Sequence, residues 1–326
     1  MRLFCLFVML GALMGTQCVD AQSQTKPKNK IRRSVILMTD VGAEMDDQWT
    51  LAHLAISPEI DLRGVVTTHA FFLPKPEAEF TAKIAKEVLA KMPVTKVPPV
   101  FAGSSLALKD DSKAYYNEGV KFLIDQSRGF DKKNRLTVLN IGAATDTASA
   151  LLMDPTLGDR IEIIAMGFTA YPEGGDEWNV KNDPIAWRVL LNSSAPILVG
   201  DATVTKRDLA MNVKRAKEVF VGGGAAGNYL VALLDDWGKK HPDLVKDGNW
   251  FIRDHVVLAH MMKLTTFDVN ERPRLESDLK FSFSAPSVGT YPTINWIKSI
   301  DAPKVWDDFN AKLKAANISY AAAQGK

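Results

Sequence analysis

Apolar runs that alternate with helical patterns constrain the fold of this chain more than any other feature. The runs are apolar throughout, which is typical of parallel strands buried on both faces. Strands are predicted at Ser34–Met38, Leu62–Thr67, Leu136–Asn140, Ile161–Met166, Ile197–Val199 and Thr293–Ile300. Helices are predicted at Trp49–Ala55, Ala78–Ala90, Asn117–Gln126, Asp146–Met153, Pro184–Asn192, Asn228–Lys239, Arg253–Leu264 and Pro303–Ala315. We therefore expect a doubly wound α/β fold, with a mostly parallel open sheet and helices on both faces.

The N-terminal residues have the pattern of a signal peptide. Arg2 precedes a short apolar run, and Val19-Asp20-Ala21 fits the small-residue rule for cleavage after Ala21. We expect a signal peptide over residues 1–21, a disordered lead-in over 22–33, one domain over 34–318 and a tail over 319–326. The chain would then be exported, either to the periplasm or as a secreted protein.

Cysteine content and charge exclude several functional classes. Both cysteines, Cys5 and Cys18, lie in the predicted signal peptide, so the mature chain would have no disulfide, thiol nucleophile or thiolate metal site. The net charge is only +2, and the charged residues are dispersed, which argues against a nucleic-acid partner. No later apolar run is long enough to span a membrane.

An acidic turn is the strongest functional signal. Asp40, Glu44, Asp46 and Asp47 follow the first predicted strand within eight residues. Clustered carboxylates repel one another unless a cation holds them, and Ca²⁺ and Mg²⁺ prefer oxygen ligands. We interpret the turn as a divalent-cation site, placed where open α/β sheets keep their active sites. The alternative is a solvated acidic turn in which Asp46 caps the following helix.

Other segments carry weaker signals. Glu177 and Asn179 offer oxygens and an amide to a polyhydroxylated ligand, whereas Asp183, before Pro184, is expected to cap a helix. Asp254 could complete a cation site or cap a helix. His69, beside two phenylalanines at a strand end, is a candidate site residue, whereas His53 and His260 are expected to pack on helix faces. The glycines of 222–227 have dinucleotide-loop spacing but follow a helical segment, so we interpret them as a flexible loop.

Taken in order, these segments resemble those of a known family. Asp40, Asp46 and Asp47 behind a buried strand resemble the N-terminal aspartate signature of the inosine-uridine-preferring nucleoside hydrolases. The resemblance continues through five further segments and covers Arg33 to about Ala315: Val100–Gly103, Val138–Asp146, Glu177–Pro184, Ile252–Asp254 and Asn295–Leu313.

The resemblance implies a set of roles. A single Ca²⁺ would be bound by Asp40, Asp47, the backbone carbonyl of Ile141 and Asp254, together with a water that Asp40 deprotonates. Asp46, Glu177 and Asn179 would hold the ribose hydroxyls, with Met166 under the sugar. Such a carboxylate-rich pocket also suits the oxocarbenium-like transition state of N-glycoside cleavage. Family members are commonly dimers or tetramers, so the resemblance also allows a homo-oligomer.

Four positions depart from the family pattern. Glu44 lies in a longer spacing between Asp40 and the aspartate pair, Met38 stands where the family usually has its first aspartate, and Phe71 falls near an expected ribose-binding asparagine. Arg253 stands where pyrimidine-accepting members have a histidine thought to protonate the base, and arginine cannot act as that acid. Purine-preferring members are thought to stack the base on tryptophan, for which Trp178, Trp250 and Tyr171 are candidates.

The sequence therefore predicts an exported, Ca²⁺-dependent N-ribosyl hydrolase that acts on a small ribosyl substrate. Two alternatives stay open at this point. One is a sugar- or nucleoside-binding protein on the same scaffold that lacks turnover. The other is a hydrolase of another glycoside, whose anionic leaving group is held by Arg253.

Overall fold

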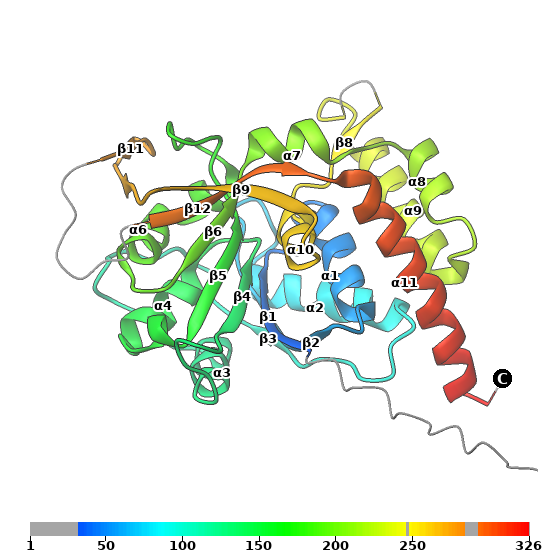
Figure 1. The fold of residues 1–326 in the computed structure, drawn as a ribbon, viewed down its shortest axis with the longest axis horizontal. Helices are drawn as coiled ribbons and strands as arrows, with labels where there is room; N and C mark the ends of the chain where they lie inside the picture. Colours follow the sequence, from blue (N-terminus) through cyan, green and yellow to red (C-terminus); the bar gives the residue numbers. More distant parts are fainter. Residues whose placement is uncertain (1–31, 246–247, 284–292, 326) are drawn as a thin grey trace, which may run out of the picture. The chain divides into compact units, whose positions relative to one another are not determined.

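The computed structural model describes residues 32–245, 248–283 and 293–325 (Figure 1). The predicted signal peptide lies outside the described residues, as does the lead-in up to Ile31. An eight-stranded sheet of order β3-β2-β1-β4-β5-β6-β12-β9 forms the centre. Every pairing in it is parallel except that between β12 and β9. The fold is a doubly wound, mostly parallel α/β sheet, as the sequence predicts.

The strands of the central sheet are β1 (Arg33–Thr39), β2 (Ile60–Thr67), β3 (Val100–Ala102), β4 (Leu136–Asn140), β5 (Ile161–Met166), β6 (Ile197–Gly200), β9 (Thr265–Glu271) and β12 (Thr293–Ile300). Two small ribbons pair β7 (Ala210–Met211) with β8 (Trp250–Phe251) and β10 (Arg274–Leu275) with β11 (Phe281–Ser282). The helices are α1 (Asp46–Ile56), α2 (Glu77–Lys91), α3 (Glu118–Ser127), α4 (Thr145–Met153), α5 (Trp178–Asn182), α6 (Pro184–Asn192), α7 (Ala202–Asp208), α8 (Val213–Val219), α9 (Gly224–Lys240), α10 (His255–Met261) and α11 (Ala302–Ala323), with a 3₁₀ turn at Leu157–Asp159.

All six predicted strands and all eight predicted helices correspond to elements of the structure, with small shifts at their ends. The interpretation of 222–227 as a flexible loop is wrong for residues 224–227, because α9 begins at Gly224. Helix α11 continues to Ala323, so residues 319–323 of the predicted tail are helical. Among the described helices, none combines the length and apolar character needed to cross a bilayer.

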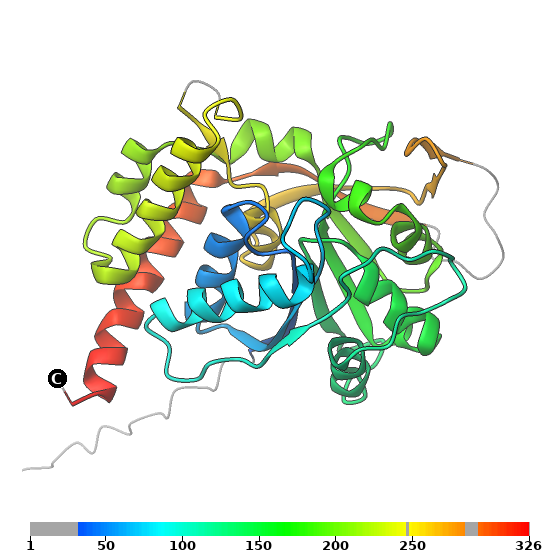
Figure 2. The same ribbon diagram turned by 180° about the vertical axis from the view of Figure 1, so that it is seen from behind.

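The sheet is covered on both faces, which explains its continuous apolar strands. Val35 and Leu37 of β1 pack into one apolar cluster, whereas Ile36 and Met38 pack into the other. Helices α1, α2, α9 and α11 lie on the first side, and α3, α4 and α6 on the second (Figures 1 and 2). Alternate side chains of a strand point to opposite faces, so a strand buried on both sides must be apolar at every position.

The order of the strands creates a crevice at the carboxyl end of the sheet. The chain moves from β1 outward to β2 and β3, and then returns to place β4 on the other side of β1. The loops that follow β1 and β4 therefore leave in opposite directions. This reversal is where doubly wound sheets bind their ligands, and both Asp40 and Ile141 lie there, each directly after its strand.

Candidate active site

The turn between β1 and α1 places the first group of carboxylates. Gly42 has a φ of +99°, which is the left-handed region that favours glycine, and it lets the chain turn sharply behind Asp40. Gly142, after β4, packs so closely that an added Cβ would lie 2.6 Å from the backbone nitrogen of Asp40. The two loops can therefore approach each other only because position 142 has no side chain.

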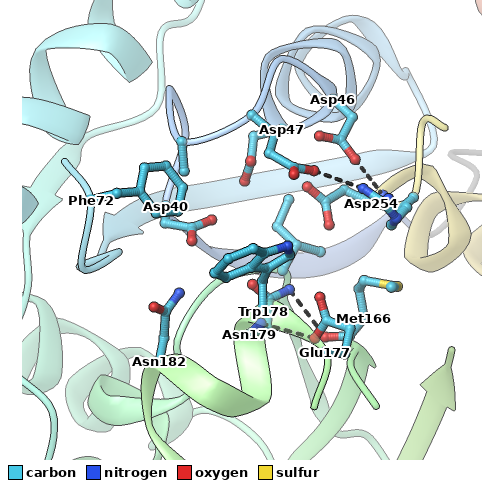
Figure 3. A pocket seen from close by; sticks show the side chains of 14 residues that line it. Asp40, Asp46, Asp47, Phe72, Met166, Glu177, Trp178, Asn179, Asn182 and Asp254 are labelled. Atoms are coloured by element: carbon cyan, nitrogen blue, oxygen red, sulfur yellow. Dashed lines mark hydrogen bonds and ion pairs between the residues drawn. The ribbon is translucent and has the colours of Figure 1, made fainter. Parts of the chain in front are cut away.

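Three carboxylates converge at the start of α1. Oxygens of Asp46, Asp47 and Asp254 all lie within 4.8 Å of one another, and all three residues are buried (Figure 3). Asp46 also accepts a hydrogen bond of 3.3 Å from the backbone nitrogen of Asp254, and Asp47 accepts one from the hydroxyl of Thr39. Two charged carboxylates at this separation repel by at least about 3 kcal/mol at an effective dielectric constant of ~20.

These aspartates do not cap their helices. The N-cap of α1 is Met45 rather than Asp46, and it makes no side-chain cap bond. Asp254 occupies the N-cap position of α10, yet its carboxylate makes no cap bond either. By contrast, Asp183 accepts a hydrogen bond of 2.9 Å from the backbone nitrogen of Ala186 and caps α6, as predicted. The capping alternative for the acidic turn is therefore wrong.

Burial raises the pKa of each carboxyl group in the pocket lining. It places the pKa values of Asp40, Asp47 and Asp254 well above their usual range, and repulsion between the neighbouring acids adds to the effect. Burial likewise raises the pKa of Glu44 to about 7 and that of Glu177 to about 8. A cation bound among these groups would allow them to ionise together.

The opposite wall of the pocket comes from β5 and the short helix α5. The amide nitrogen of Asn179 donates to the backbone oxygen of Met166 at 3.3 Å, which ties α5 to the end of β5. Glu177 caps α5, accepting a hydrogen bond of 2.9 Å from the backbone nitrogen of Asn179. Trp178 points toward Phe72 across the mouth, with the ring centroids 5.9 Å apart (Figure 3).

Arg253 lies at the edge of the same pocket, where it is paired with Glu44. Its Nη1 is 2.8 Å from Glu44 Oε2, and its guanidinium carbon lies 5.0 Å from the ring centroid of Trp250 and 5.7 Å from that of Phe251. It is the one cationic side chain among the described residues that line the pocket. Glu44 and Arg253, two of the departures from the family pattern, are therefore the two partners of one ion pair.

The structure brings nearly all of the predicted site residues together in one pocket of about 370 Å³. Its lining includes Asp40, Asp46, Asp47, Ile141, Met166, Glu177, Trp178, Asn179, Arg253 and Asp254. His69 is not in this lining. Its Nε2 lies 3.0 Å from the hydroxyl of Thr145, at the start of α4.

The grouping of the acids differs in one respect from the expected ligand set. Asp46, rather than Asp40, shares the tight group with Asp47 and Asp254, because Asp46 and Asp47 are neighbours in the first turn of α1. Asp40 lines the same pocket from the turn before the helix. Its charge contributes to the raised pKa of Asp47, which shows that the two groups are close.

The sequence analysis missed three residues of the lining: Ala43, Phe72 and Asn182. Asn182 is buried, and its amide nitrogen has no hydrogen-bond partner among the described residues. No motif marks it, but it lies one residue before the helix cap Asp183, at the end of α5. Phe72 is more than half exposed, which is unusual for a large aromatic side chain and consistent with a binding surface.

The donor set fits a hard divalent cation. Asp46 Oδ1 is buried without a hydrogen-bond partner among the described residues, and it lies in a group of three carboxylates. Buried carboxylate oxygens without partners are rare unless they bind an ion or a ligand. Oxygen-only ligands suit Ca²⁺ or Mg²⁺, and nothing in the group is a soft ligand for a transition metal.

Comparison with known families decides where the chain belongs. The family model described as inosine-uridine preferring nucleoside hydrolase matches residues 35–307. The chain belongs to this family. The match spans the described fold from the first strand to α11 and includes every residue of the pocket lining. No curated protein matches the sequence significantly.

Solved nucleoside hydrolases share the fold of this family member at low sequence identity. A plant nucleoside hydrolase is 20% identical, with a TM-score of 0.70 over 87% of this chain and 99% of its own. A purine-preferring ribonucleoside hydrolase from Gardnerella vaginalis is 21% identical, with a TM-score of 0.66 over 88% and 100%. An inosine-uridine preferring nucleoside hydrolase from Bacillus anthracis is 15% identical, with a TM-score of 0.61 over 86% and 99%.

Proposed function

We propose that the chain hydrolyses the N-glycosidic bond of a ribonucleoside or a related ribosyl N-glycoside, with Ca²⁺ bound among its aspartates. The observation that carries this proposal is the convergence of acids from three distant segments, Asp40 with Asp46 and Asp47, Glu177, and Asp254, in one pocket of a nucleoside hydrolase fold. The buried, partnerless oxygen of Asp46 supports the cation.

The residues of the pocket divide into a group for the cation and a group for the sugar. Asp40, Asp47, Asp254 and the backbone carbonyl of Ile141 would hold Ca²⁺, and Asp46, which forms a tight group with Asp47 and Asp254, would share that role. When bound, the cation lowers the pKa of a water held beside it. Glu177 and Asn179 face these acids from α5 and would accept and donate hydrogen bonds to the ribose hydroxyls.

In this proposal, Asp40 takes the proton from the attacking water. It lies in the turn directly behind β1, and its carboxylate faces the pocket (Figure 3). As the bond between sugar and base breaks, positive charge develops at the anomeric carbon and the ring oxygen. The surrounding carboxylates stabilise that charge, because they are fixed in place before the reaction begins. Met166 offers an apolar floor against the sugar ring.

Release of free ribose tests the proposal. The purified chain, with Ca²⁺ added, would be incubated with inosine, uridine and 4-nitrophenyl riboside. We expect free ribose from at least one of them, and loss of that activity with a chelator. Calorimetric binding of ribose or a nucleoside without any release of ribose would instead indicate a binding protein on this scaffold.

We propose further that the chain acts outside the cytoplasm on a small ribosyl substrate. The support is the signal-peptide pattern of residues 1–21. Secretion of the tagged, full-length chain, with a new N-terminus at Gln22, would test this. Retention of the uncleaved chain inside the cell would contradict it.

A further inference from the structure

The pocket has a buried floor and an exposed rim that differ in chemistry. Asp46, Asp47, Asp254, Ile141 and Met166 form the floor, and each is at most 5% exposed. The rim consists of side chains that reach solvent: Phe72, Trp178, Glu44 and Arg253. If the ribose lies over Met166, as in the proposed function, the leaving base extends from the floor toward this rim.

Arg253 is held at this rim in a fixed orientation. Glu44 binds Nη1 at 2.8 Å, while the rings of Trp250 and Phe251 lie against the guanidinium. A guanidinium has five donors in a planar fork, so one bond to Glu44 leaves others for a ligand. Arg253 lines the same pocket as Asp46 and Glu177, and its side chain is about one fifth exposed.

We propose that Arg253, braced by Glu44, stabilises the departing base as an anion, and that this contact favours ribosides of 6-oxopurines. This inference rests on the proposed hydrolysis. In the step, the bond between the anomeric carbon and the base nitrogen breaks, and its electron pair stays on the base. The water oxygen bonds to the anomeric carbon, and its proton goes to Asp40. The base leaves beside Arg253 and takes up a proton from solvent.

The shape of the guanidinium selects this class of base. Negative charge on a 6-oxopurine spreads to the carbonyl oxygen and the ring nitrogens, and the oxygen and N7 form two adjacent acceptors. Arginine binds this pair of acceptors through two parallel hydrogen bonds in its commonest contact with guanine. A 6-aminopurine presents a donor in place of the oxygen, so it can make only one of the two bonds. Trp178 and Phe72 supply flat apolar surfaces for the ring itself.

A double-mutant cycle between enzyme and substrate tests this contact. Values of kcat/KM for inosine and 7-deazainosine, which lacks the N7 acceptor, would be measured for the native chain, Arg253→Met and Arg253→Lys. We expect the native chain to prefer inosine by about 10- to 100-fold. Both variants should reduce that ratio at least tenfold, because lysine keeps the charge but not the fork. Glu44→Gln should reduce it by a smaller factor.

Arg160→Lys is the matched control, because Arg160 forms a similarly half-buried ion pair with Asp154, outside the pocket lining. The ratio of kcat/KM for inosine to that for 7-deazainosine should be the same in Arg160→Lys as in the native chain.

Activity of the native chain on 4-nitrophenyl riboside distinguishes failure of the proposed hydrolysis from failure of the role of Arg253. If that substrate also gives no ribose, the proposed hydrolysis itself fails. If it is hydrolysed but inosine is not, or if Arg253→Met leaves the inosine to 7-deazainosine ratio unchanged, the role of Arg253 is overturned.

Discussion

At the scale of single residues, Asp40 differs from the other buried acids of this edge of the sheet by its surroundings. Asp146 is equally buried, but it accepts hydrogen bonds from Ser104 and Asn117 and is fully used in holding the loops together. Asp40 faces the pocket and other carboxylates instead. A buried carboxylate without such partners is available for proton transfer.

We therefore expect Asp40→Asn to lower kcat for ribose release by about 10²- to 10⁴-fold, the usual contribution of a general base. Steady-state kinetics with the best substrate would measure this. Asp146→Asn is the control, because it removes a buried aspartate from the same edge of the sheet. It should lower the melting temperature but leave kcat unchanged. Equal losses of kcat in both variants would show that Asp40 has only a structural role.

The charge pattern predicted the acids of the pocket, and the family resemblance added uncharged residues such as Met166; Asn182 carries neither signal and was missed. Asp40, Asp46 and Asp47 lie within eight residues directly behind an apolar strand, so their convergence follows from local sequence. Asn182 enters the pocket only because α5 turns it there, and a lone asparagine has no pattern. His69 lies outside the pocket lining, and its position was hard to foresee because the alternation of faces beyond the end of a strand no longer says where a side chain points.

At the scale of elements, the site depends on how α1 is held against α10. Thr50 lies one helical turn after Asp46 and Asp47, on the same face of α1, and His255 directly follows Asp254. The hydroxyl of Thr50 and Nδ1 of His255 are 2.8 Å apart, and both residues are fully buried. This bond joins the two helix starts that carry the three clustered carboxylates.

We expect Thr50→Val to weaken Ca²⁺ binding by about 10- to 100-fold, the usual effect of losing a contact that orients metal ligands. Calorimetric titration with Ca²⁺ would measure it. Thr265→Val is the matched control, because its hydroxyl makes a comparable bond of 2.9 Å to His260 at the other end of α10. Its Ca²⁺ affinity should stay native. A similar loss of affinity in both variants would mean that the bond stabilises α10 in general.

Elements with a buried face were predictable, whereas exposed or very short ones were not. The six central strands and the longer helices have apolar patterns that match their burial. Strand β9 is mostly exposed, and its sequence TTFDVNE has little apolar character, so it was missed. Helix α5 has only five residues, too few for a periodic pattern, and depends on its cap Glu177 and on the contact between Asn179 and β5.

At the scale of the whole molecule, the pocket concentrates negative charge in a chain whose net charge is only +2. Without a cation, burial raises the pKa values of Glu44 and Glu177 to about 7 and about 8, so both bind protons more tightly in the folded than in the unfolded chain. Their stabilising contribution is complete below their unfolded values near 4.5, and it is lost as the pH rises through 7 to 8. His53 acts in the opposite sense, because burial lowers its pKa from 6.5 to about 4. The unfolded chain therefore binds this proton more tightly, and stability falls as the pH drops from 6.5 toward 4.

If Ca²⁺ binds among these acids, as proposed, it should oppose the loss of stability at high pH, because it would bind their ionised forms and compete with their protons. We expect the melting temperature of the native chain to rise by ~5 °C on adding Ca²⁺ to about 100 times its dissociation constant at pH 8. At the same Ca²⁺ concentration, the rise at pH 5 should be much smaller. Thermal unfolding at both pH values, with Ca²⁺ or with a chelator, isolates this effect from that of His53, because the contribution of His53 is the same in both solutions.

In the Asp254→Asn variant, added Ca²⁺ should raise the melting temperature little at either pH. An equal rise at pH 5 and pH 8 would mean that Ca²⁺ binds elsewhere than among these buried acids.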